Sequence, residues 1–140
     1  MNPIPHTENA PVLRTDFSNP SVWEEIRAAI QKPVTPFGFI AYVDFIDDVQ
    51  YADITKDQLL KLISPDHNHS FIIVVDRTAF SNPEHPLLVI DLFDASHREF
   101  RATPSQVQGI ENNLSIGNMD FEEIADSVDD DGIFRGFSEG

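Results

Sequence analysis

Two apolar runs that each end in an aspartate decide the fold class: Phe71–Asp76 (FIIVVD) and Leu87–Asp91 (LLVID). Every position before the acid is apolar in both runs, a pattern typical of strands that are covered on both faces. The linker between them, residues 77–86, is shorter than the roughly dozen residues that a parallel crossover needs. The sequence therefore predicts two neighbouring antiparallel strands inside a sheet.

Towards the N-terminus, strand and helix signals alternate. Val12–Phe17 and Phe37–Phe45 have strand character. Between them, Asn19 precedes a proline at the first helical position, which predicts a helix from Pro20. A T-x-x-Q capping box that starts at Thr55 predicts a second helix before the first apolar run. This order favours crossover connections and hence an α/β fold.

Towards the C-terminus, a short strand is predicted around Arg98–Ala102, followed by two helices. Thr103–Gln106 (TPSQ) combines a capping box with a proline in the first turn, and Asp120–Val128 has the apolar spacing of a helix. The prediction is a single α/β domain over residues 12–140, with a mixed, mostly five-stranded sheet, about four helices, and an acidic C-terminal helix and tail. Residues 1–11 contain three prolines and no periodicity, which predicts a mobile N-terminal leader.

Charge is the strongest compositional signal: 24 Asp and Glu face 9 Lys and Arg, a formal net charge of −15. Direct binding to nucleic-acid phosphates or to an anionic membrane surface depends on clustered Lys and Arg, so this charge disfavours both. The chain has no cysteine, which excludes disulfides, thiolate nucleophiles and cysteine zinc sites. No apolar run approaches about 18 residues, and residues 1–11 lack the basic start and apolar stretch of a secretory signal. We therefore expect a cytoplasmic protein without a membrane span.

Four segments carry a resemblance to a known family: Leu13–Phe17 (LRTDF), Asp76–Arg77 (DR), Pro83–Leu92 (PEHPLLVIDL) and Asn112–Ala125 (NNLSIGNMDFEEIA). Over nearly its whole length, the chain resembles a family of small bacterial proteins of unknown function. The resemblance implies a bacterial source and a single domain. It brings no activity, ligand or catalytic residue to assign to positions of this sequence.

Several predicted strands finish on carboxylates, and three of these, Asp16, Asp44 and Asp76, belong to strands that are expected to be parallel. The carboxyl ends of parallel strands are where α/β sheets hold ligands, and converging carboxylates there can bind Mg²⁺ for phosphoester chemistry. Asp91 ends an antiparallel strand, so it is expected at the opposite end of the sheet. The alternative is that these aspartates form strand-terminating turns, because Asp side chains bind nearby backbone.

Histidines offer a second set of candidate ligands: His67 and His69 before the first apolar run, and His85 in the linker after it. Imidazole nitrogens bind zinc and other divalent ions, and in a strand His67 and His69 would share a face. A metal site needs further ligands that the sequence does not place, and the alternative is that these are polar loop residues. We expect no bound metal and no cofactor.

Recognisable catalytic motifs are missing from the sequence. There is no G-x-S-x-G elbow around any serine, and the six glycines show neither Walker nor dinucleotide-binding spacing. These absences favour a protein that is not an enzyme.

Acidic residues are concentrated at the C-terminus: residues 111–140 contain nine acids and one base, Arg135, a net charge of −8. An acidic helix with apolar side chains beside it is suited to attract and hold a basic partner. The alternative is a solvated helix face that aids solubility. The candidate partner-binding residues are Glu122, Glu123, Asp126, Asp129, Asp130, Asp131 and Phe134.

Two classes of function follow. The first is a non-catalytic protein-binding module, such as an inhibitor or immunity-type protein that neutralises a basic target by presenting carboxylates where phosphates would lie. Its partner is expected to be an unidentified basic protein, and a second copy of the chain is the alternative cover for an apolar sheet edge. The second is a divalent-metal-dependent phosphoester hydrolase that uses Asp16, Asp44 and Asp76. High acidity would repel a polyanionic substrate, which favours the binding module.

Overall fold

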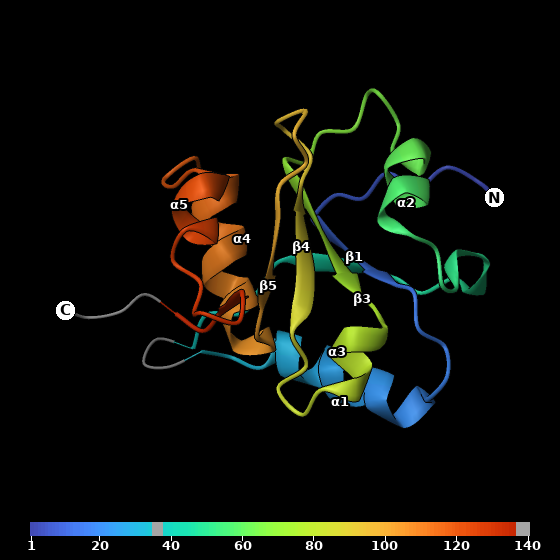
Figure 1. Ribbon diagram of the computed structural model, residues 1–140, viewed down its shortest axis with the longest axis horizontal. Helices are drawn as coiled ribbons and strands as arrows, with labels where there is room; N and C mark the ends of the chain where they lie inside the picture. Colours follow the sequence, from blue (N-terminus) through green and yellow to red (C-terminus); the bar gives the residue numbers. More distant parts are fainter. Residues whose placement is uncertain (35–37, 137–140) are drawn as a thin grey trace.

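The fold is built around one mixed β-sheet in the computed structural model, which describes residues 1–34 and 38–136. The six strands of the sheet lie in the order β2-β1-β3-β4-β5-β6 (Figure 1). They are β1 (Ala10–Arg14), β2 (Val43–Ile46), β3 (Phe71–Val75), β4 (Leu87–Asp91), β5 (Glu99–Ala102) and β6 (Ile133–Phe134). The predicted single α/β domain with a mixed sheet is confirmed, and the sheet has one strand more than predicted.

In the described part of the chain, five α-helices connect and flank the strands, one more than predicted. They are α1 (Pro20–Gln31), α2 (Lys56–Leu62), α3 (Arg77–Ser81), α4 (Val107–Ser115) and α5 (Phe121–Ala125). Two short 3₁₀ turns, Val49–Tyr51 and Pro104–Gln106, are also present. Figure 1 shows α2 on one side of the sheet and α4 and α5 on the other, so both faces are covered.

Side chains on the two faces of the sheet form separate core layers. Alternate residues of β3 divide between them: Ile73 lies in the same cluster as Trp23 and Ile26 of α1, whereas Ile72 lies in the cluster of Leu59 from α2. All five residues of β3 are buried, which is why its sequence is apolar at every position. Burial of each large apolar side chain contributes about 1.5–3 kcal/mol to stability.

The pairing of the strands sets the two ends of the sheet. β3 and β4 are antiparallel neighbours, as predicted, with Phe71 opposite Asp91. β1 lies between β2 and β3 and is parallel to both, so the connections between these strands are crossovers. β5 is antiparallel to β4, and β6 is parallel to β5. The carboxyl ends of β1, β2, β3 and β5 therefore share one end of the sheet with the start of β4, and the end of β4 lies at the other.

The capping signals of the first two helices are confirmed. Asn19 Oδ1 accepts the backbone N–H groups of Ser21 and Val22, at 3.0 and 3.3 Å. Thr55 and Gln58 form the reciprocal capping box of α2. These contacts satisfy N–H groups that the first turn of a helix leaves without a partner, which is why the signals are visible in the sequence.

The start of α4 differs from the prediction. Thr103 makes no side-chain cap, and Pro104–Gln106 form a 3₁₀ turn that leads into α4 at Val107. The Thr103 hydroxyl instead lies 3.4 Å from the Ser105 hydroxyl. The predicted capping box at Thr103 is therefore wrong, although the helix itself is present.

The second strand is shorter than predicted. β2 starts at Val43, and earlier in the chain the Val34 N–H donates to the Phe39 carbonyl at 2.8 Å in an isolated antiparallel bridge. Gly38, next to this bridge, has a φ of +70°, a conformation that residues with a Cβ rarely adopt. Phe37, where the strand is predicted to start, lies outside the described residues.

Two short elements have no counterpart in the prediction. α3 lies within the linker 77–86, and its N-cap is Asp76, whose Oδ1 accepts the Ala79 N–H at 3.2 Å. β6 has two residues, too few for a periodic signal, and places Ile133 opposite Arg101 of β5. Both elements depend on contacts with distant parts of the chain or on a single cap, and neither produces a hydrophobic repeat.

The N-terminal segment packs against the sheet. Ile4 is 6% exposed, and its N–H donates to the Leu62 carbonyl of α2 at 2.8 Å. The Tyr51 hydroxyl lies 3.0 Å from the Asn2 carbonyl, to which it donates. Burial, assisted by the charge of Asp48, raises the pKa of Tyr51, so the hydroxyl keeps its proton. The predicted leader therefore contributes to the packing of the domain, and β1 begins inside it.

Within residues 1–34 and 38–136, none of the helices is long and apolar enough to cross a membrane. Residues 137–140 of the predicted acidic tail lie outside the described part of the chain.

Candidate functional site

The three strand-end carboxylates of the hydrolase hypothesis do not meet. Asp76 is engaged within the protein: Arg101 donates from Nη1 to its Oδ1 at 2.9 Å and from Nη2 to its Oδ2 at 2.8 Å. Asp16 is 6% exposed, and its Oδ1 accepts the Ser18 N–H at 2.8 Å. Asp76 thus pairs with a cation. Asp16 forms a strand-terminating turn, which is the alternative to a ligand site that its position in the sequence left open.

Asp44 lies inside β2, near the start of β1, because β2 continues to Ile46. Its Oδ2 accepts the Asn9 N–H at 2.8 Å. Among the described residues, no group of three or more His, Asp or Glu could hold a metal ion. The expected convergence of Asp16, Asp44 and Asp76 is therefore absent. The register of β2 separates Asp44 from the other two, and contacts within the protein occupy both Asp16 and Asp76.

His85 lies apart from the other two candidate histidines, His67 and His69. His67 and His69 precede β3, whereas His85 precedes β4, and these antiparallel strands start at opposite ends of the sheet. His85 Nδ1 lies 2.8 Å from the Ala79 carbonyl oxygen, and its Nε2 lies 2.7 Å from Glu25 Oε2. In the described part of the chain these histidines form no shared ligand set.

Three of the six carboxylates that the sequence assigns to a partner are paired within the protein. Arg98 Nη2 donates to Asp126 Oδ1 at 2.5 Å. Arg135 donates to Asp129 Oδ2 and to Asp131 Oδ2, each at 2.7 Å. These three carboxylates are therefore occupied within the protein, whereas a partner surface needs carboxylates that are available.

Arg135 also binds Glu84, with Nε to Oε2 at 2.7 Å and Nη2 to Oε1 at 2.8 Å. Hydrogen bonds from Arg135 hold the pKa of Glu84 and the pKa of Asp131 below their ordinary values, and they raise the pKa of Arg135 itself. Because Glu84 follows α3 and Arg135 follows β6, this cluster connects the last strand to the turn before β4.

The other three carboxylates of the predicted surface form no ion pair with Lys or Arg of the described residues. Glu123 Oε1 accepts the Asp120 N–H at 3.2 Å, which caps α5. The side chains of Glu122 and Asp130 take part in no hydrogen bond or ion pair with the described residues. Glu122 is the one of these two that lines a hollow next to the sheet.

Phe134 does not belong to a partner surface. It is 2% exposed and packs against Phe100, with ring centroids 6.4 Å apart. The assignment is wrong because β6 pairs with β5, which places Phe134 opposite Ala102 and turns its side chain into the core.

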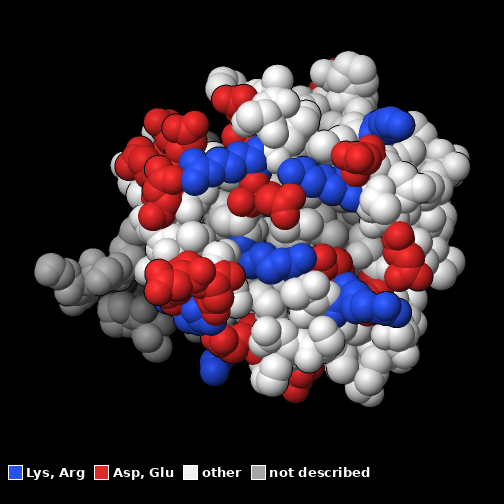
Figure 2. Space-filling view, viewed as in Figure 1, with Lys and Arg blue, Asp and Glu red and all other residues white. Residues whose placement is uncertain are grey.

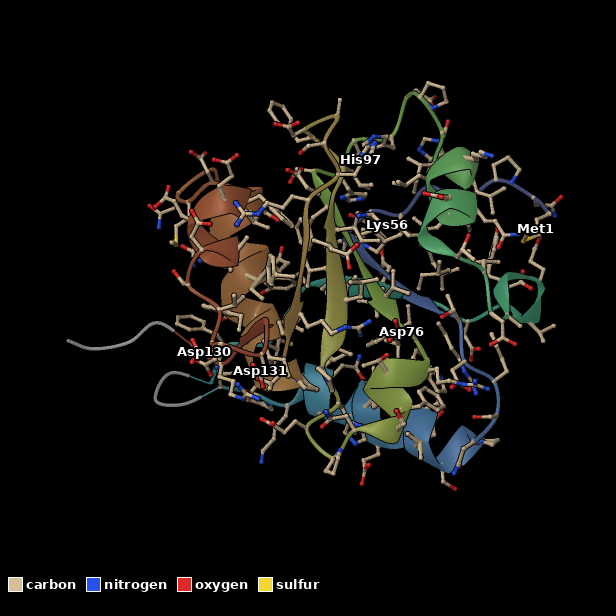
Figure 3. The ribbon with its side chains drawn as sticks, in the orientation of Figure 1. Met1, Lys56, Asp76, His97, Asp130 and Asp131 are labelled. Atoms are coloured by element: carbon tan, nitrogen blue, oxygen red, sulfur yellow. The ribbon has the colours of Figure 1, made fainter. Side chains whose placement is uncertain are left out.

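A groove lies at the end of the sheet where β4 ends and β1 and β3 begin. Figure 3 labels Asp76 at one end of the sheet and His97, in the β4–β5 turn, at this other end. Two adjoining hollows of about 350 and 460 Å³ form the groove, and they share Ser70 and Leu114. Six carboxylates line it: Glu8, Asp91, Asp94, Glu111, Asp120 and Glu122. We refer to it as the acidic groove.

The acidic groove carries negative charge without a matching cation. Among the described residues that line it there is no Lys or Arg. In the adjacent β4–β5 turn, Arg98 is paired with Asp126, and Lys56 Nζ donates to Glu99 Oε1 at 2.7 Å. Figure 2 shows Asp and Glu side chains gathered over the corner that carries α5. The carboxyl-terminal end of α4 adds the partial negative charge of its last carbonyls.

Asp91 is the most buried of the six carboxylates, at 5% exposed. Its Oδ1 accepts the N–H groups of Phe93 and Asp94, at 2.9 and 3.2 Å. The residue lines the groove, and these two contacts form the turn that follows β4.

Glu111 repeats this arrangement on α4, at 9% exposed. Its Oε1 accepts the Ser115 hydroxyl at 3.1 Å, a contact between residues one helical turn apart. Glu111 lines the second hollow. The acidic groove therefore contains two largely buried carboxylates, Asp91 and Glu111, that are each hydrogen-bonded within the protein.

Phe93 stands at the rim of the groove and is 88% exposed. The turn that presents it is held in place, because His97 Nδ1 lies 2.9 Å from the Asp91 carbonyl oxygen and Asp91 Oδ1 accepts the Phe93 N–H. Leu114 and Phe121 line the groove beside it. An exposed aromatic side chain next to apolar and acidic groups is typical of a protein contact surface.

Sequence reasoning missed Asp91, Asp94 and Glu111 as site residues. Asp91 and Asp94 flank Phe93 directly after a buried strand, and an aromatic residue in an acidic turn is a local signal for them. Glu111 gives no such signal, because only the packing of α4 brings it to the same groove.

Comparison with curated proteins finds no match for this chain. The model of one domain family matches residues 9–137 of the 140 residues, which includes all six strands and every groove carboxylate except Glu8. This match confirms the resemblance to a family of unknown function. The chain belongs to the family described as a domain of unknown function (DUF6924).

Proposed function

We propose that this protein is a non-catalytic binding module that docks a basic protein at the acidic groove and the neighbouring carboxylates of α5. The observation that carries the proposal is the groove itself, which six carboxylates and no Lys or Arg line among the described residues. A binding site with charge of one sign attracts partners of the opposite sign and rejects partners of the same sign. The proposal keeps the bacterial source and the cytoplasmic location that we expect from the sequence.

Charge and apolar contact have different parts in this docking. The surplus of 24 acids over 9 bases steers a basic partner from a distance and raises the association rate, more so at low salt. Phe93 and the apolar groove residues supply the contact area that keeps the complex together. An inhibitor or immunity-type protein that covers the basic site of its target would work in this way.

The hydrolase hypothesis receives no support from the geometry. Asp76 is bound to Arg101, and Asp44 is bound to the backbone of Asn9. The binding module is therefore the one function that we propose.

The test is affinity capture from a bacterial lysate with the full chain, at about 50 and about 500 mM salt. A basic protein captured at low salt is then purified, and its affinity is measured for the wild type and for the double variant Asp94→Lys/Glu122→Lys. Both side chains are exposed, so the fold should tolerate the change. We expect the double variant to lose binding, because two cations would stand in the groove.

Glu24→Lys is the matched control, because Glu24 is exposed on α1, away from the acidic groove. It changes the net charge in the same direction and should leave most of the binding intact. Equal binding by the wild type and the double variant would exclude the acidic groove as the docking site. Equal loss in the Glu24 control would show that net charge alone, and not the groove, causes binding.

A further inference from the structure

β2 is an edge strand of the sheet, because β1 lies on one side of it and no described strand lies on the other. An edge strand presents backbone N–H and C=O groups that can pair with another chain. Ile40 and Tyr42, which lead into β2, are 46% and 65% exposed. The edge therefore combines backbone groups that are open to pairing with exposed apolar side chains.

The pairing of β1 shows which residues of β2 face outward. The Thr15 N–H, at the end of β1, donates to the last carbonyl of β3 at 3.0 Å. Successive residues of a strand direct their backbone groups to opposite sides, so the backbone of Val12 faces β2. Since Val12 is in register with Phe45, the backbone groups of Asp44 and Ile46 bond to β1. The N–H and C=O groups of Phe45 therefore point away from the sheet.

The side chain of Phe45 lies on the face of the sheet that α1 covers. Its ring packs edge-on against Trp23, with ring centroids 5.8 Å apart. Arg27 of α1 stacks over the same ring, with its Cζ 4.9 Å from the centroid. Among the described residues, Arg27 has no carboxylate partner. A cation without an ion pair thus lies beside the open edge.

We propose that two copies of this chain pair through β2, antiparallel about a two-fold axis, with Phe45 of each copy opposite Phe45 of the other. A two-fold axis closes the assembly, because the same surface is used on both sides. The two Phe45 residues exchange both backbone hydrogen bonds, since their N–H and C=O groups face outward. Their rings lie on the same face, where aromatic cross-strand pairs stabilise a sheet.

The acidic residues in and after β2 select this register. With Asp44 as the centre, its carboxylate would lie opposite Asp44 of the second copy. With Ile46 as the centre, Asp44 would lie opposite Asp48 of the second copy. Like charges directly opposite each other destabilise a sheet. With Phe45 as the centre, Asp44 lies opposite Ile46, and no two acids of residues 42–48 face each other.

Charge complementarity supports a second copy as the occupant of the edge. In this register Asp47 of one copy lies diagonally across from Phe45 of the other, a spacing of about 7–8 Å that long side chains can bridge. The Asp47 side chain is 41% exposed, and its Oδ1 accepts Arg14 Nη1 at 3.1 Å. Arg14 stacks on Trp23, so Asp47 lies on the α1 face. Arg27 on that face can therefore reach Asp47 of the second copy, and the contact occurs twice by symmetry.

This pairing goes beyond the proposed function, because the acidic groove takes no part in it. Antiparallel pairing places Ile40 and Tyr42 of one copy beside the end of β2 in the other, where part of their exposed apolar surface becomes covered. Two copies joined in this way present two acidic grooves, so a partner with two basic segments would be bound at both.

Sedimentation equilibrium of the full chain tests the pairing. The measurement uses about 150 mM salt, which screens the repulsion between two acidic copies beyond about 8 Å. Between roughly 1 and 200 µM protein, the average mass should rise from that of one chain towards twice that value. A mass of one chain throughout this range would overturn the inference.

Arg27→Glu tests the charge complementarity. The variant places a carboxylate near Asp47 of the second copy, so the dissociation constant of the dimer should rise about tenfold. Arg77→Glu is the matched control, because it makes the same change in charge at an exposed position of α3, where β1 and β3 separate it from the edge. Its dissociation constant should stay within about twofold of the wild type.

Hydrogen exchange of the wild-type chain tests the register without a substitution. The Phe45 amide faces outward in a single chain and is hydrogen-bonded in the proposed pair. At a protein concentration that favours the dimer it should exchange about tenfold more slowly than in the single chain. The amides of Asp44 and Ile46 bond to β1 and should be protected equally at both concentrations.

The same measurements identify other occupants of the edge. If the copies associate but the Phe45 amide exchanges at an unchanged rate, another surface joins them and the inference is wrong. If the mass stays that of one chain and the captured basic protein protects the Phe45 amide, the edge accepts a strand of that partner and the inference is again wrong. The proposed function is tested separately, by capture with the Asp94→Lys/Glu122→Lys variant, so either can fail alone.

Discussion

Arg101 holds both carboxylate oxygens of Asp76, at 2.9 and 2.8 Å, and its Nη1 also donates to the Pro86 carbonyl at 2.9 Å. The contact connects β5 to the residue that follows β3, although β4 lies between these strands. The two side chains are 24% and 25% exposed. The pair therefore occupies the end of the sheet where an α/β fold often holds a ligand, and a candidate ligand site is found at the opposite end.

Replacing Asp76 should destabilise the fold by two separable contributions. Asp76→Ala removes the ion pair with Arg101 and the cap of α3, and we expect a loss of about 2 kcal/mol in the free energy of unfolding. Asp76→Asn keeps Oδ1 as the acceptor for Ala79 and should lose about half as much. Urea unfolding of both variants measures this, and identical losses would mean that the cap contributes nothing.

The Arg135 cluster predicts a specific change in acid titrations. Because hydrogen bonds from Arg135 lower the pKa of Glu84 and of Asp131, Arg135→Gln should raise both pKa values towards their ordinary range. Folded-state pKa values that are lowered stabilise the fold at pH values above the ordinary carboxyl range, and this stability is lost as the pH falls through the lowered values. Titration followed by NMR measures both groups.

Asp94 is the internal control for that titration. Hydrogen bonds from Ser96 lower its pKa, so the Arg135→Gln variant should leave it unchanged. A shift of Asp94 equal to that of Glu84 would indicate a general loss of structure and not the loss of one partner.

The N-terminal segment should contribute measurably to stability. Ile4 is 6% exposed in the core layer of Leu59 and Tyr51, so Ile4→Ala should cost about 2 kcal/mol in the free energy of unfolding. Met1→Ala changes a side chain that is 64% exposed and should cost less than about 0.5 kcal/mol. Two variants of equal stability would show that the segment acts as a dispensable leader.

Phe93 should affect binding and not folding. Phe93→Ala removes an exposed rim side chain, so the free energy of unfolding should change by less than about 0.5 kcal/mol, while the affinity for the captured basic partner should fall about fivefold. Val49→Ala is the control, because Val49 is 69% exposed and does not line the groove. Calorimetric titration of both variants measures the difference, and an unaltered affinity for Phe93→Ala removes this residue from the contact surface.

Local signals account for the parts of the fold that were predictable. The caps at Asn19 and Thr55 involve donors and acceptors within three residues, so the sequence contains the whole interaction. The apolar strands β3 and β4 are buried on both faces, which leaves the same pattern at every position. By contrast, β6 forms because Ile133 and Phe134 pair with β5, and a stretch of two residues is too short to give a strand pattern in the sequence.

For the candidate site residues, too, local sequence signals are not enough, because tertiary contacts decide their position. Asp44 was expected at a strand end, but the register of β2 against β1 places it beside Asn9. Phe134 was expected on an acidic surface, but strand pairing buries it. A shift of one or two residues in strand position changes the neighbours of a side chain completely, and sequence patterns do not specify position that closely.

The sequence by itself determined the α/β class, the antiparallel central pair, the first two helix starts and the strongly acidic character, because composition, periodicity and capping are properties of short stretches. Only the tertiary structure decided which carboxylates are neutralised and which are free. Arg98, Arg101 and Arg135 each pair with a carboxylate that lies 25 to 51 residues away in the chain. Asp91 and Glu111 line two adjoining hollows because β4 and α4 end at the same side of the sheet. Electrostatic interactions depend on distance in space, and the packing of the elements sets that distance.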